Sequence, residues 1–478
     1  MQKFGIGQGA TRVEDKRLTT GQGRYIDDIN LEGQARAVFL RSPHAHAKII
    51  AIDIEAALSL PGVLGIYTVT DLKTDGIGDV PCLAPARNHD ESTCVMPPRP
   101  ALAAGRFRHV GDAVAMIVAE TSMQAQDAAE AVWVEYEELP AIVTTDEAMG
   151  SGVAQVWEQA PDNRCFAWET GDAPATTAAM NEAAHIVELE LINNRVVPTS
   201  METRGAIAAV EPETGRLILH VSCQGVHIMR RILATAIFNV AEEDIHVLCD
   251  DVGGGFGMKI FVFPEYVNLL YAARKLQRPI KWISERNEAF VSDSHGRDHV
   301  TRMQLALDKN AGILGLKVNT TANLGAYLSN FAPFVATAAG VGMLVGCYKI
   351  PCAHVQVSGV FTNTTPVDAY RGAGRPEATF LVERMVNLLA DELGMDPVEL
   401  RRKNLIPKFE DGHDVATGIS YDSGDYQLTL DKALEQVNYQ QLREEQARLR
   451  ENNQYMGIGV TCYCEICGIG PSQVAGAV

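Results

Sequence analysis

Two glycine-rich turns contain the residues of this sequence best suited to binding a ligand. The first, Gly253-Gly254-Gly255-Phe256-Gly257, lies between a predicted strand at 245–248 and a predicted helix at 264–276. Because glycine has no side chain, the backbone can approach a ligand closely, and its N–H groups can bind an anion. The spacing matches neither the GxGxxG dinucleotide motif nor the Walker motif. A tight glycine turn often serves the fold alone, so binding and structural interpretations both stay open on this motif.

The second turn, Tyr370-Arg371-Gly372-Ala373-Gly374-Arg375, again precedes a predicted helix, at 378–393. Its arginines suit a phosphate or a carboxylate, because the planar guanidinium donates paired hydrogen bonds. The structural alternative is a helix start whose arginines pair with surface acids. A third signal is Gln224, which with His227 follows the predicted apolar strand 217–221. A lone histidine in such a place is usually a satisfied polar group rather than a catalytic one.

Two other groups of reactive residues give weaker signals. Asp293, Ser294 and His295 are adjacent, but the sequence has no GxSxG motif that would build a hydrolase nucleophile around them. Cys462, Cys464 and Cys467 could ligate a metal, yet a closed tetrahedral site needs a fourth ligand, and no second cysteine or histidine pair lies nearby. We interpret that segment as a strand with small, partly buried residues.

The composition is that of a globular protein with an acidic surface. The 478 residues include 41 lysines and arginines against 60 aspartates and glutamates, a net charge of −19. Such a surface repels nucleic acid and anionic lipid, so we expect neither as a partner. The N-terminus lacks the apolar run of a signal peptide, and no stretch approaches the roughly 18 apolar residues of a membrane span. These features predict a cytoplasmic protein with no membrane segment.

The elements that position these turns belong to several domains, because a chain of this length exceeds a single core. We expect a mixed α/β (α+β) multidomain fold. Strand and helix patterns, including strand 113–119 and helix 121–132, predict a small α/β domain after a short arm. A Gly/Ser/Pro-bearing stretch reads as a linker, a larger mixed domain follows, and a helix at 428–451 with a strand at 458–463 opens a further domain that looks cut short. The predicted boundaries are 1–19 for the arm, 20–145, 146–177 for the linker, 178–408 and 409–478.

Taken together, these segments resemble the molybdopterin-binding large subunit of the xanthine dehydrogenase, aldehyde oxidase and carbon monoxide dehydrogenase family. The GGGFG and AYRGAGRPE strings carry the resemblance most strongly, and the strings at 40–47 and 201–205 extend it over nearly the whole chain. The resemblance implies that 20–145 is an α/β hammerhead domain and 178–408 the first molybdopterin-binding domain. Residues 409–478 would be the incomplete start of a second molybdopterin-binding domain, and the second turn is a form II-like loop.

The resemblance also implies which residues hold the cofactor, a molybdenum–molybdopterin in its cytosine dinucleotide form. Gln224 would face the apical side of the metal. The backbone of Gly255, Phe256 and Gly257 would lie against the metal and dithiolene, with Arg371 and Gly372 approaching from the other side. No side chain would ligate the metal directly.

Departures from the family pattern narrow the expected substrate. Gly372 stands where copper-dependent carbon monoxide dehydrogenases have a cysteine, which argues against a copper site. Ile260 follows the glycine-loop lysine where purine-oxidising relatives have a glutamate, and an apolar side chain cannot hydrogen-bond a purine. The motifs are closest to those of the aldehyde-oxidising members, so an aldehyde or an N-heterocycle is the expected small-molecule substrate, oxidised with water as the oxygen source. The family's glutamate base would lie beyond the end of this chain, so the catalytic residue is unknown, and neither Glu265 nor Glu377 is assigned that role.

The electron path implied by the family requires partners. The sequence has neither an iron–sulfur cysteine framework nor a flavin motif, so separate [2Fe–2S] and FAD subunits are expected, in a dimer of heterotrimers. As an isolated piece the chain would be inactive, whether a fragment of a longer product or one part of a split subunit. Two alternatives stay open: a non-catalytic fragment or scaffold that retains the fold, and a carbon monoxide dehydrogenase-like large subunit without the copper-binding cysteine.

Overall fold

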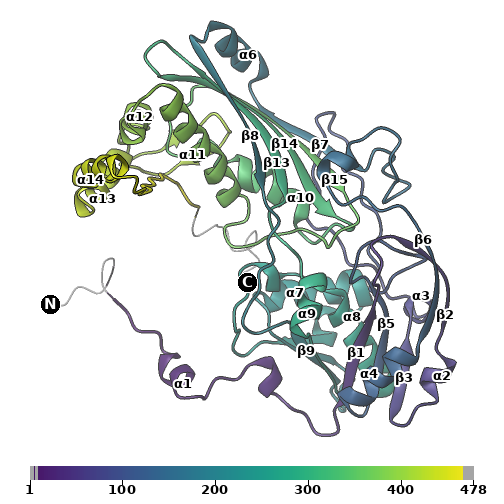
Figure 1. The fold of residues 1–478 in the computed structure, drawn as a ribbon. Coiled ribbons are helices and arrows are strands. Elements are labelled where there is room, and N and C mark those ends of the chain that lie inside the picture. The colour runs from purple at the N-terminus through teal and green to yellow at the C-terminus, as the bar shows by residue number, and fades with distance from the viewer. Residues whose placement is uncertain (1–4, 6–8, 467–478) are drawn as a thin grey trace.

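The largest sheet combines strands from two of the predicted domains (Figure 1). The computed structural model describes residue 5 and residues 9–466. The sheet has seven strands in the order β11-β10-β9-β12-β1-β5-β3. Their bounds are β1 Ala35–Arg41, β3 Val63–Tyr67, β5 Ala113–Ala119, β9 Gly205–Val210, β10 Leu217–Val221, β11 Ile245–Leu248 and β12 Ile280–Ile283. Strand β1 pairs in parallel with β12, so the boundary predicted at 145 does not separate two sheets.

Strand β5 explains how the predicted hammerhead region joins the rest. All seven of its residues are buried, because it lies between β1 and β3 and both of its faces are covered. Ile117 packs with α4 (Ser122–Ala131), whereas Met116 faces the core that contains α8 (Pro264–Leu276). A small antiparallel sheet, β4-β2-β6, completes this region, with β2 Ala47–Asp53, β4 Arg106–Phe107 and β6 Trp133–Glu138. The predicted strand 113–119 and helix 121–132 are confirmed.

A second large sheet has five strands in the order β7-β15-β14-β13-β8. Their bounds are β7 Arg164–Gly171, β8 His185–Asn193, β13 His299–Leu307, β14 Ile313–Gly325 and β15 Ala353–Phe361. Strand β7 pairs antiparallel with β15 along its length, and α6 (Ala173–Glu182) packs against β14 and β15. This corrects the linker predicted at 146–177: residues 164–171 form strand β7, residues 146–148 and 173–177 belong to helices α5 (Thr145–Ala148) and α6, and residues 149–163 form turns and irregular loop.

The helices that follow the two glycine-rich turns are α8 and α11 (Arg375–Glu392). Helix α8 spans the predicted 264–276, and Pro264 occupies its first position, where a missing N–H costs nothing. Helix α11 begins three residues before the predicted start at 378, with Pro376 in its first turn. It packs on β8 and β13 of the five-stranded sheet, as Figure 1 shows.

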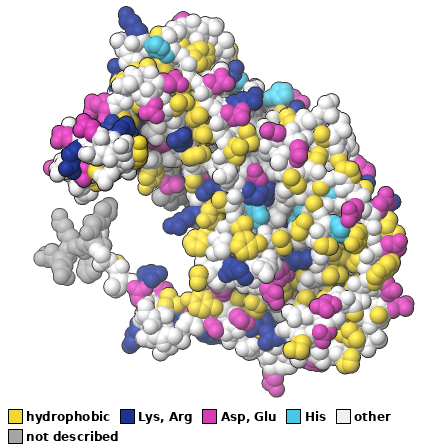
Figure 2. All heavy atoms as spheres, viewed as in Figure 1, with side chains coloured by type: hydrophobic (Ala, Val, Ile, Leu, Met, Phe, Trp, Pro, Cys, Tyr) yellow, Lys and Arg dark blue, Asp and Glu magenta, His cyan; other side chains and the backbone are white. Residues whose placement is uncertain are grey.

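The C-terminal part departs most from the prediction. The helix predicted at 428–451 is two helices, α13 (Tyr426–Gln436) and α14 (Tyr439–Glu451), because Asn438 adopts a left-handed backbone conformation with φ of 50°. Residues 458–463 were predicted as a strand but form no regular structure. Seen from one side, the molecule has a deep notch between the helices α11–α14 and the seven-stranded sheet (Figure 2).

The remaining elements are short. They are α1 Asp15–Thr19, α2 Glu55–Leu58, α3 Val69–Thr74, α5 Thr145–Ala148, α7 Val226–Ile232, α9 Arg286–Ser292, α10 Ala332–Phe334, α12 Pro397–Asn404, β16 His413–Asp414, β17 Ser420–Tyr421, the 3-10 turns η1 Ile26–Asp28, η3 Glu242–Asp244 and η4 Met258–Ile260, and the π-helical turns η2 Leu233–Phe238 and η5 Val335–Ala339. Among residues 5 and 9–466, no helix has both the length and the apolar character to cross a membrane.

Candidate functional site

The two glycine-rich turns, more than 110 residues apart in the sequence, lie against each other in the structure. The N–H of Arg371 donates a hydrogen bond to the carbonyl of Phe256, at 2.9 Å. The guanidinium of Arg371 also lies 5.7 Å from the centroid of the Phe256 ring. The first turn begins just after β11, and the second ends where α11 begins. The loop that follows β11 of the seven-stranded sheet therefore meets the start of the helix that packs on the five-stranded sheet.

Glycine is required where the turns approach other backbone most closely. Gly257 has a φ of +91°, and a Cβ there would lie 3.1 Å from the carbonyl oxygen of Ala369. Gly374 has a φ of +89°, and a Cβ there would lie 2.5 Å from the backbone nitrogen of Gly340. Side chains at either position would be strained and would push the segments apart.

Both turns present backbone N–H groups that have no acceptor among the described residues. Within the part of the chain that the structure describes, no group accepts a hydrogen bond from the amides of Gly254, Gly255, Phe256 or Gly372. Successive backbone N–H groups around left-handed glycines form a concave site for an anion. Phe256 is 40% exposed, so its side chain does not fill the space as a core side chain would. These residues fit an anionic, partly aromatic group such as a metal–pterin with its phosphates.

Gln224 lies beside the first turn, and its side chain is turned into it. Its Oε1 accepts a hydrogen bond from the N–H of Gly257 at 2.9 Å, and a Cβ on Gly255 would lie only 2.4 Å from that oxygen. Ile260, the predicted substrate-pocket residue, ends the η4 turn and is half-buried at the margin of the core around α8. The structure thus gathers Gln224, Gly255, Phe256, Gly257, Arg371 and Gly372 in one place, with Ile260 three residues further along the chain.

Three side chains hold the first turn in place: the half-buried Glu202 and the buried Ser222 and Lys259. The Glu202 carboxylate accepts hydrogen bonds from the N–H of Gly253 at 2.8 Å and from Nζ of Lys259 at 2.8 Å, and the Ser222 hydroxyl donates to it as well. Burial opposes ionisation of Glu202, but its bonds to Lys259 and Ser222 outweigh burial and lower the pKa of its carboxyl. Sequence reasoning did not assign these residues. Glu202 belongs to the string 201–205, which was noted for its family likeness alone.

Arg297 performs the corresponding task for the second turn. Its guanidinium donates to the carbonyls of Tyr370 (3.2 Å) and Arg371 (2.9 Å) and to the carboxylate of Glu377 (3.1 Å). Glu377 in turn accepts the N–H of Gly374 at 2.9 Å, so it caps the start of α11. Arg297 therefore fixes two carbonyls of this turn and the acid that caps α11. No sequence motif pointed to Arg297.

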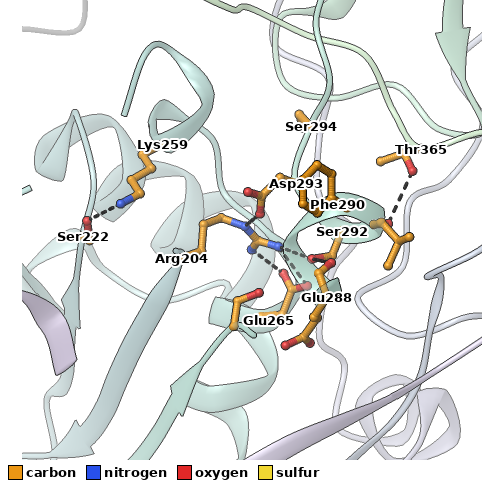
Figure 3. Close-up of polar contacts among 12 residues, drawn as sticks. Arg204, Ser222, Lys259, Glu265, Glu288, Phe290, Ser292, Asp293, Ser294 and Thr365 are labelled. Carbon is orange, nitrogen blue, oxygen red and sulfur yellow. Dashed lines mark hydrogen bonds and ion pairs between the residues drawn. The ribbon is translucent and has the colours of Figure 1, made fainter. Parts of the chain in front are cut away.

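A buried ionic cluster joins the site to the predicted hammerhead region. The guanidinium of Arg204 is 0% exposed and contacts Glu265 at 2.8 Å and Asp293 at 2.5 Å (Figure 3). Arg41 of β1 reaches the same Glu265 at 2.7 Å and Glu288 at 2.6 Å. Burial opposes ionisation of Glu265, but the charges of Arg204 and Arg41 outweigh it and lower the pKa of its carboxyl to about 2.

As far as the structure describes them, the weaker candidate groups do not form sites. Asp293 is taken up by Arg204, and Nε2 of His295 lies 2.9 Å from the carbonyl of Phe290, so these residues do not form a hydrolase triad with Ser294. In the described residues no cluster of three or more His, Cys, Asp or Glu side chains is placed to hold a metal ion. Cys462 and Cys464 are half-buried, and Cys467 lies outside the described residues.

Comparisons with known proteins give two family matches. Residues 156–405 match the molybdopterin cofactor-binding domain, and residues 20–140 match the aldehyde oxidase and xanthine dehydrogenase a/b hammerhead domain. The carbon monoxide dehydrogenase large chain of Hydrogenophaga pseudoflava is 34% identical, over 98% of this chain and 59% of that protein. The 6-hydroxypseudooxynicotine dehydrogenase complex subunit gamma of Paenarthrobacter nicotinovorans is also 34% identical, with the same coverage.

Among solved structures, quinoline 2-oxidoreductase from Pseudomonas putida 86 superimposes with a TM-score of 0.90. It is 32% identical, and the alignment covers 99% of this chain and 59% of that one. The chain therefore spans about 59% of the length of the relatives it matches.

Proposed function

Because this chain belongs to the family of molybdopterin-binding large subunits that includes xanthine dehydrogenase, aldehyde oxidase and carbon monoxide dehydrogenase, we propose that its turns 253–257 and 371–374 hold a molybdenum–molybdopterin. The observation that carries the proposal is the direct contact of the two turns through Arg371 and Phe256. Around that contact, the N–H groups of Gly254, Gly255, Phe256 and Gly372 donate no hydrogen bond to any group within residues 5 and 9–466. An acidic protein needs such neutral donors to bind an anionic group without a cluster of cationic side chains.

Each residue of the site has a role in this proposal. The amides of Gly254, Gly255 and Phe256 donate to the anionic part of the cofactor, and the exposed Phe256 ring contacts its flat part. Gln224, fixed by Gly257, presents its amide nitrogen, whereas Arg371 and Gly372 close the site from the second turn. When bound, the molybdenum centre supplies oxidation of an electrophilic carbon with oxygen from water. Glu265 and Glu377 do not act as proton acceptors, since both are engaged in buried ion pairs.

The proposed substrate is an aldehyde or an N-heterocycle. The half-buried Ile260 offers a substrate only apolar contact, which suits such a molecule better than a purine. Gly372 has no sulfur to bind a copper ion, so carbon monoxide is not proposed as the substrate, although carbon monoxide dehydrogenase chains are among the relatives. The likeness to quinoline 2-oxidoreductase, at 32% identity, favours the N-heterocycle.

We further propose that the chain works as part of a larger assembly, because relatives of which it spans 59% are named as large chains or as subunits of a complex. The proposed partners are a [2Fe–2S] subunit and an FAD subunit that carry the electrons away, in a dimer of heterotrimers. The pterin is proposed in its cytosine dinucleotide form.

The proposal is tested with a pair of glycine substitutions in protein expressed with molybdate. Gly257→Ala and Gly215→Ala both introduce a side chain at positive φ, but a Cβ at Gly257 meets the Ala369 carbonyl, whereas a Cβ at Gly215 meets nothing within 4 Å. We expect Gly257→Ala to hold at least tenfold less molybdenum and pterin per chain than Gly215→Ala, by elemental analysis and by fluorescence of the oxidised pterin. Dye reduction with an N-heterocycle or an aldehyde by the assembled enzyme identifies the substrate class.

Two results would contradict the proposal. One is a wild-type subunit that carries no molybdenum under molybdate-replete expression, which would favour a scaffold that has kept only the fold. The other is equal molybdenum content in the two glycine variants, which would place the cofactor away from these turns.

A further inference from the structure

Two cysteines far apart in the sequence have their sulfur atoms in contact. The Sγ atoms of Cys347 and Cys464 are 3.4 Å apart, although 117 residues separate them in the sequence. Cys347 lies in the turn that precedes β15 and is 2% exposed, whereas Cys464 is half-buried in the segment 456–466 that follows α14. A disulfide needs the sulfurs at about 2.05 Å. An approach of little more than 1 Å would therefore join them.

The surroundings give the two thiols different chemical roles. The two sulfurs share a hydrogen bond in which either thiol can be the donor, and this bond lowers the pKa of Cys464 and raises that of Cys347. The hydroxyl of Tyr426 lies 3.2 Å from the Cys464 sulfur as well. Cys464 also lines an open groove of about 430 Å³, together with Arg375 and Thr461, so a small reagent can reach it. Since the thiolate is the reactive form, Cys464 is the attacking group.

We propose that Cys347 and Cys464 form a reversible intramolecular disulfide when the protein meets a low-molecular-mass disulfide such as oxidised glutathione. The Cys464 thiolate attacks one sulfur of the reagent, which breaks its S–S bond and releases the first glutathione thiol. Cys347 then attacks the Cys464 sulfur of the mixed disulfide and releases the second. Two electrons pass from the protein to the reagent, and the two protons leave on the released thiols.

The new bond would fasten the segment 456–466 beside the second glycine-rich turn. Glu465, next to Cys464, is 3.4 Å from Nε of Arg375. Arg375 in turn donates through Nη1 to the carbonyl of Ala373 at 3.1 Å. Oxidation would therefore hold Glu465 against the residue that supports this turn. The inference rests on the contact of the two sulfur atoms and stands whether or not the turn binds molybdopterin.

The test is peptide mapping of the 478-residue chain after incubation with oxidised glutathione. The sequence has no lysine or arginine within residues 318–348 or within 451–478, so trypsin yields one peptide with Cys347, 318–349, and one with Cys464, 451–478. We expect two of the ten thiols to be lost and the two peptides to be linked, with both effects reversed by dithiothreitol. After trypsin cleaves at Arg450, the peptide 451–478 should stay linked to the peptide that contains Cys347 only under non-reducing conditions.

Matched variants decide which cysteine reacts. Cys464→Ser should abolish the link, whereas Cys462→Ser and Cys467→Ser, which alter the same tryptic peptide, should retain it. Cys347→Ala should leave a stable glutathione adduct on Cys464, which confirms the order of attack. The proposal is overturned if all ten thiols survive, if the wild type accumulates the adduct without a link, or if the link persists in Cys464→Ser. As a control, each reduced variant should unfold at the same midpoint as the wild type, which establishes that it folds.

Discussion

The substitution of Arg204 by methionine is the most direct test of how the site is built into the fold. Arg204 is fully buried and lies between the carboxylates of Glu265 and Asp293. Methionine fills part of the same space with an unbranched apolar side chain, but it lacks the guanidinium that lies 3.7 Å from the centroid of the Phe263 ring. The substitution therefore removes a charge and its hydrogen bonds while leaving two acids buried.

The expected loss of stability is about 3–5 kcal/mol, the cost of leaving a buried charge without its partner. The pKa of Glu265 gives an independent magnitude. Its fall from the ordinary value of 4.5 to about 2 corresponds to about 3 kcal/mol, at 1.36 kcal/mol for each pH unit. Arg41 supplies part of that stabilisation and is retained in the variant, so the lower end of the range is expected.

Urea unfolding followed by tryptophan fluorescence measures the loss, because the ring of Trp282 lies 5.3 Å from the Arg204 guanidinium. With an m-value of about 3 kcal/mol/M, a loss of 3 kcal/mol lowers the midpoint by about 1 M. The control is Arg302→Met, which breaks the pair with Glu190 on the surface of β13, where the Arg302 side chain is 72% exposed. That variant should unfold at nearly the same urea concentration as the wild type, because an exposed ion pair contributes little to stability.

The pKa of Glu265 also predicts how the stability loss in Arg204→Met should change with pH. The pKa of Glu265 is lower in the folded protein, so its stabilising contribution is present above pH 4.5 and is lost as the pH falls toward about 2. In Arg204→Met the carboxylate has lost a cation, and protonation relieves the penalty. The difference between variant and wild type should therefore shrink as the pH is lowered from 7 toward 3. Equal losses for Arg204→Met and Arg302→Met, or a difference that grows at low pH, would refute the reasoning.

Two further substitutions test the supports of the second turn. Arg297→Met removes hydrogen-bond donors to two carbonyls of the turn and to Glu377. The free energy of unfolding should therefore fall by about 2–3 kcal/mol, and the molybdenum content should fall as well. A variant with unchanged stability and full molybdenum content would show that Arg297 does not support the turn. Gly374→Ala places a Cβ 2.5 Å from the nitrogen of Gly340, whereas Gly418→Ala, at a nearly equal φ of +88°, meets nothing within 4 Å. Urea midpoints should show a loss of about 1–2 kcal/mol for Gly418→Ala and a clearly larger one for Gly374→Ala, and equal losses would remove the argument from close approach.

The sequence located the glycine-rich turns because their residue types carry the signal locally. At positions 257 and 374 the backbone has a positive φ and lies close to another segment, and glycine is the residue type that permits both. The supports were missed for the opposite reason. Glu202 contacts Gly253 across 51 residues, and Arg297 contacts Tyr370 across 73. Both contacts are made with backbone atoms, and a residue's type does not indicate which distant side chain its backbone binds.

The secondary-structure prediction was wrong where the local sequence pattern and the long-range strand pairing disagree. The alternation at 458–463 resembles a strand, but it pairs with no strand in the described part of the chain, and a strand alone does not satisfy its backbone groups. Strand β7 was taken for linker because Gly and Pro residues surround it, yet β15 supplies it with a complete pairing edge. The helical pattern across Asn438 continued without a signal strong enough to mark the left-handed break there.

The parallel pairing of β1 with β12 has a consequence for how this protein can be divided. The strands of residues 35–119 fill one side of a sheet whose other side carries the first glycine-rich turn, and Arg41 adds an ionic bond between the two sides. A truncation at 145 would expose the edge of β12 and uncover the apolar side of α8, a combination prone to aggregate. A chimera made from related proteins should therefore take the predicted domains 20–145 and 178–408 from the same parent, because they share one sheet.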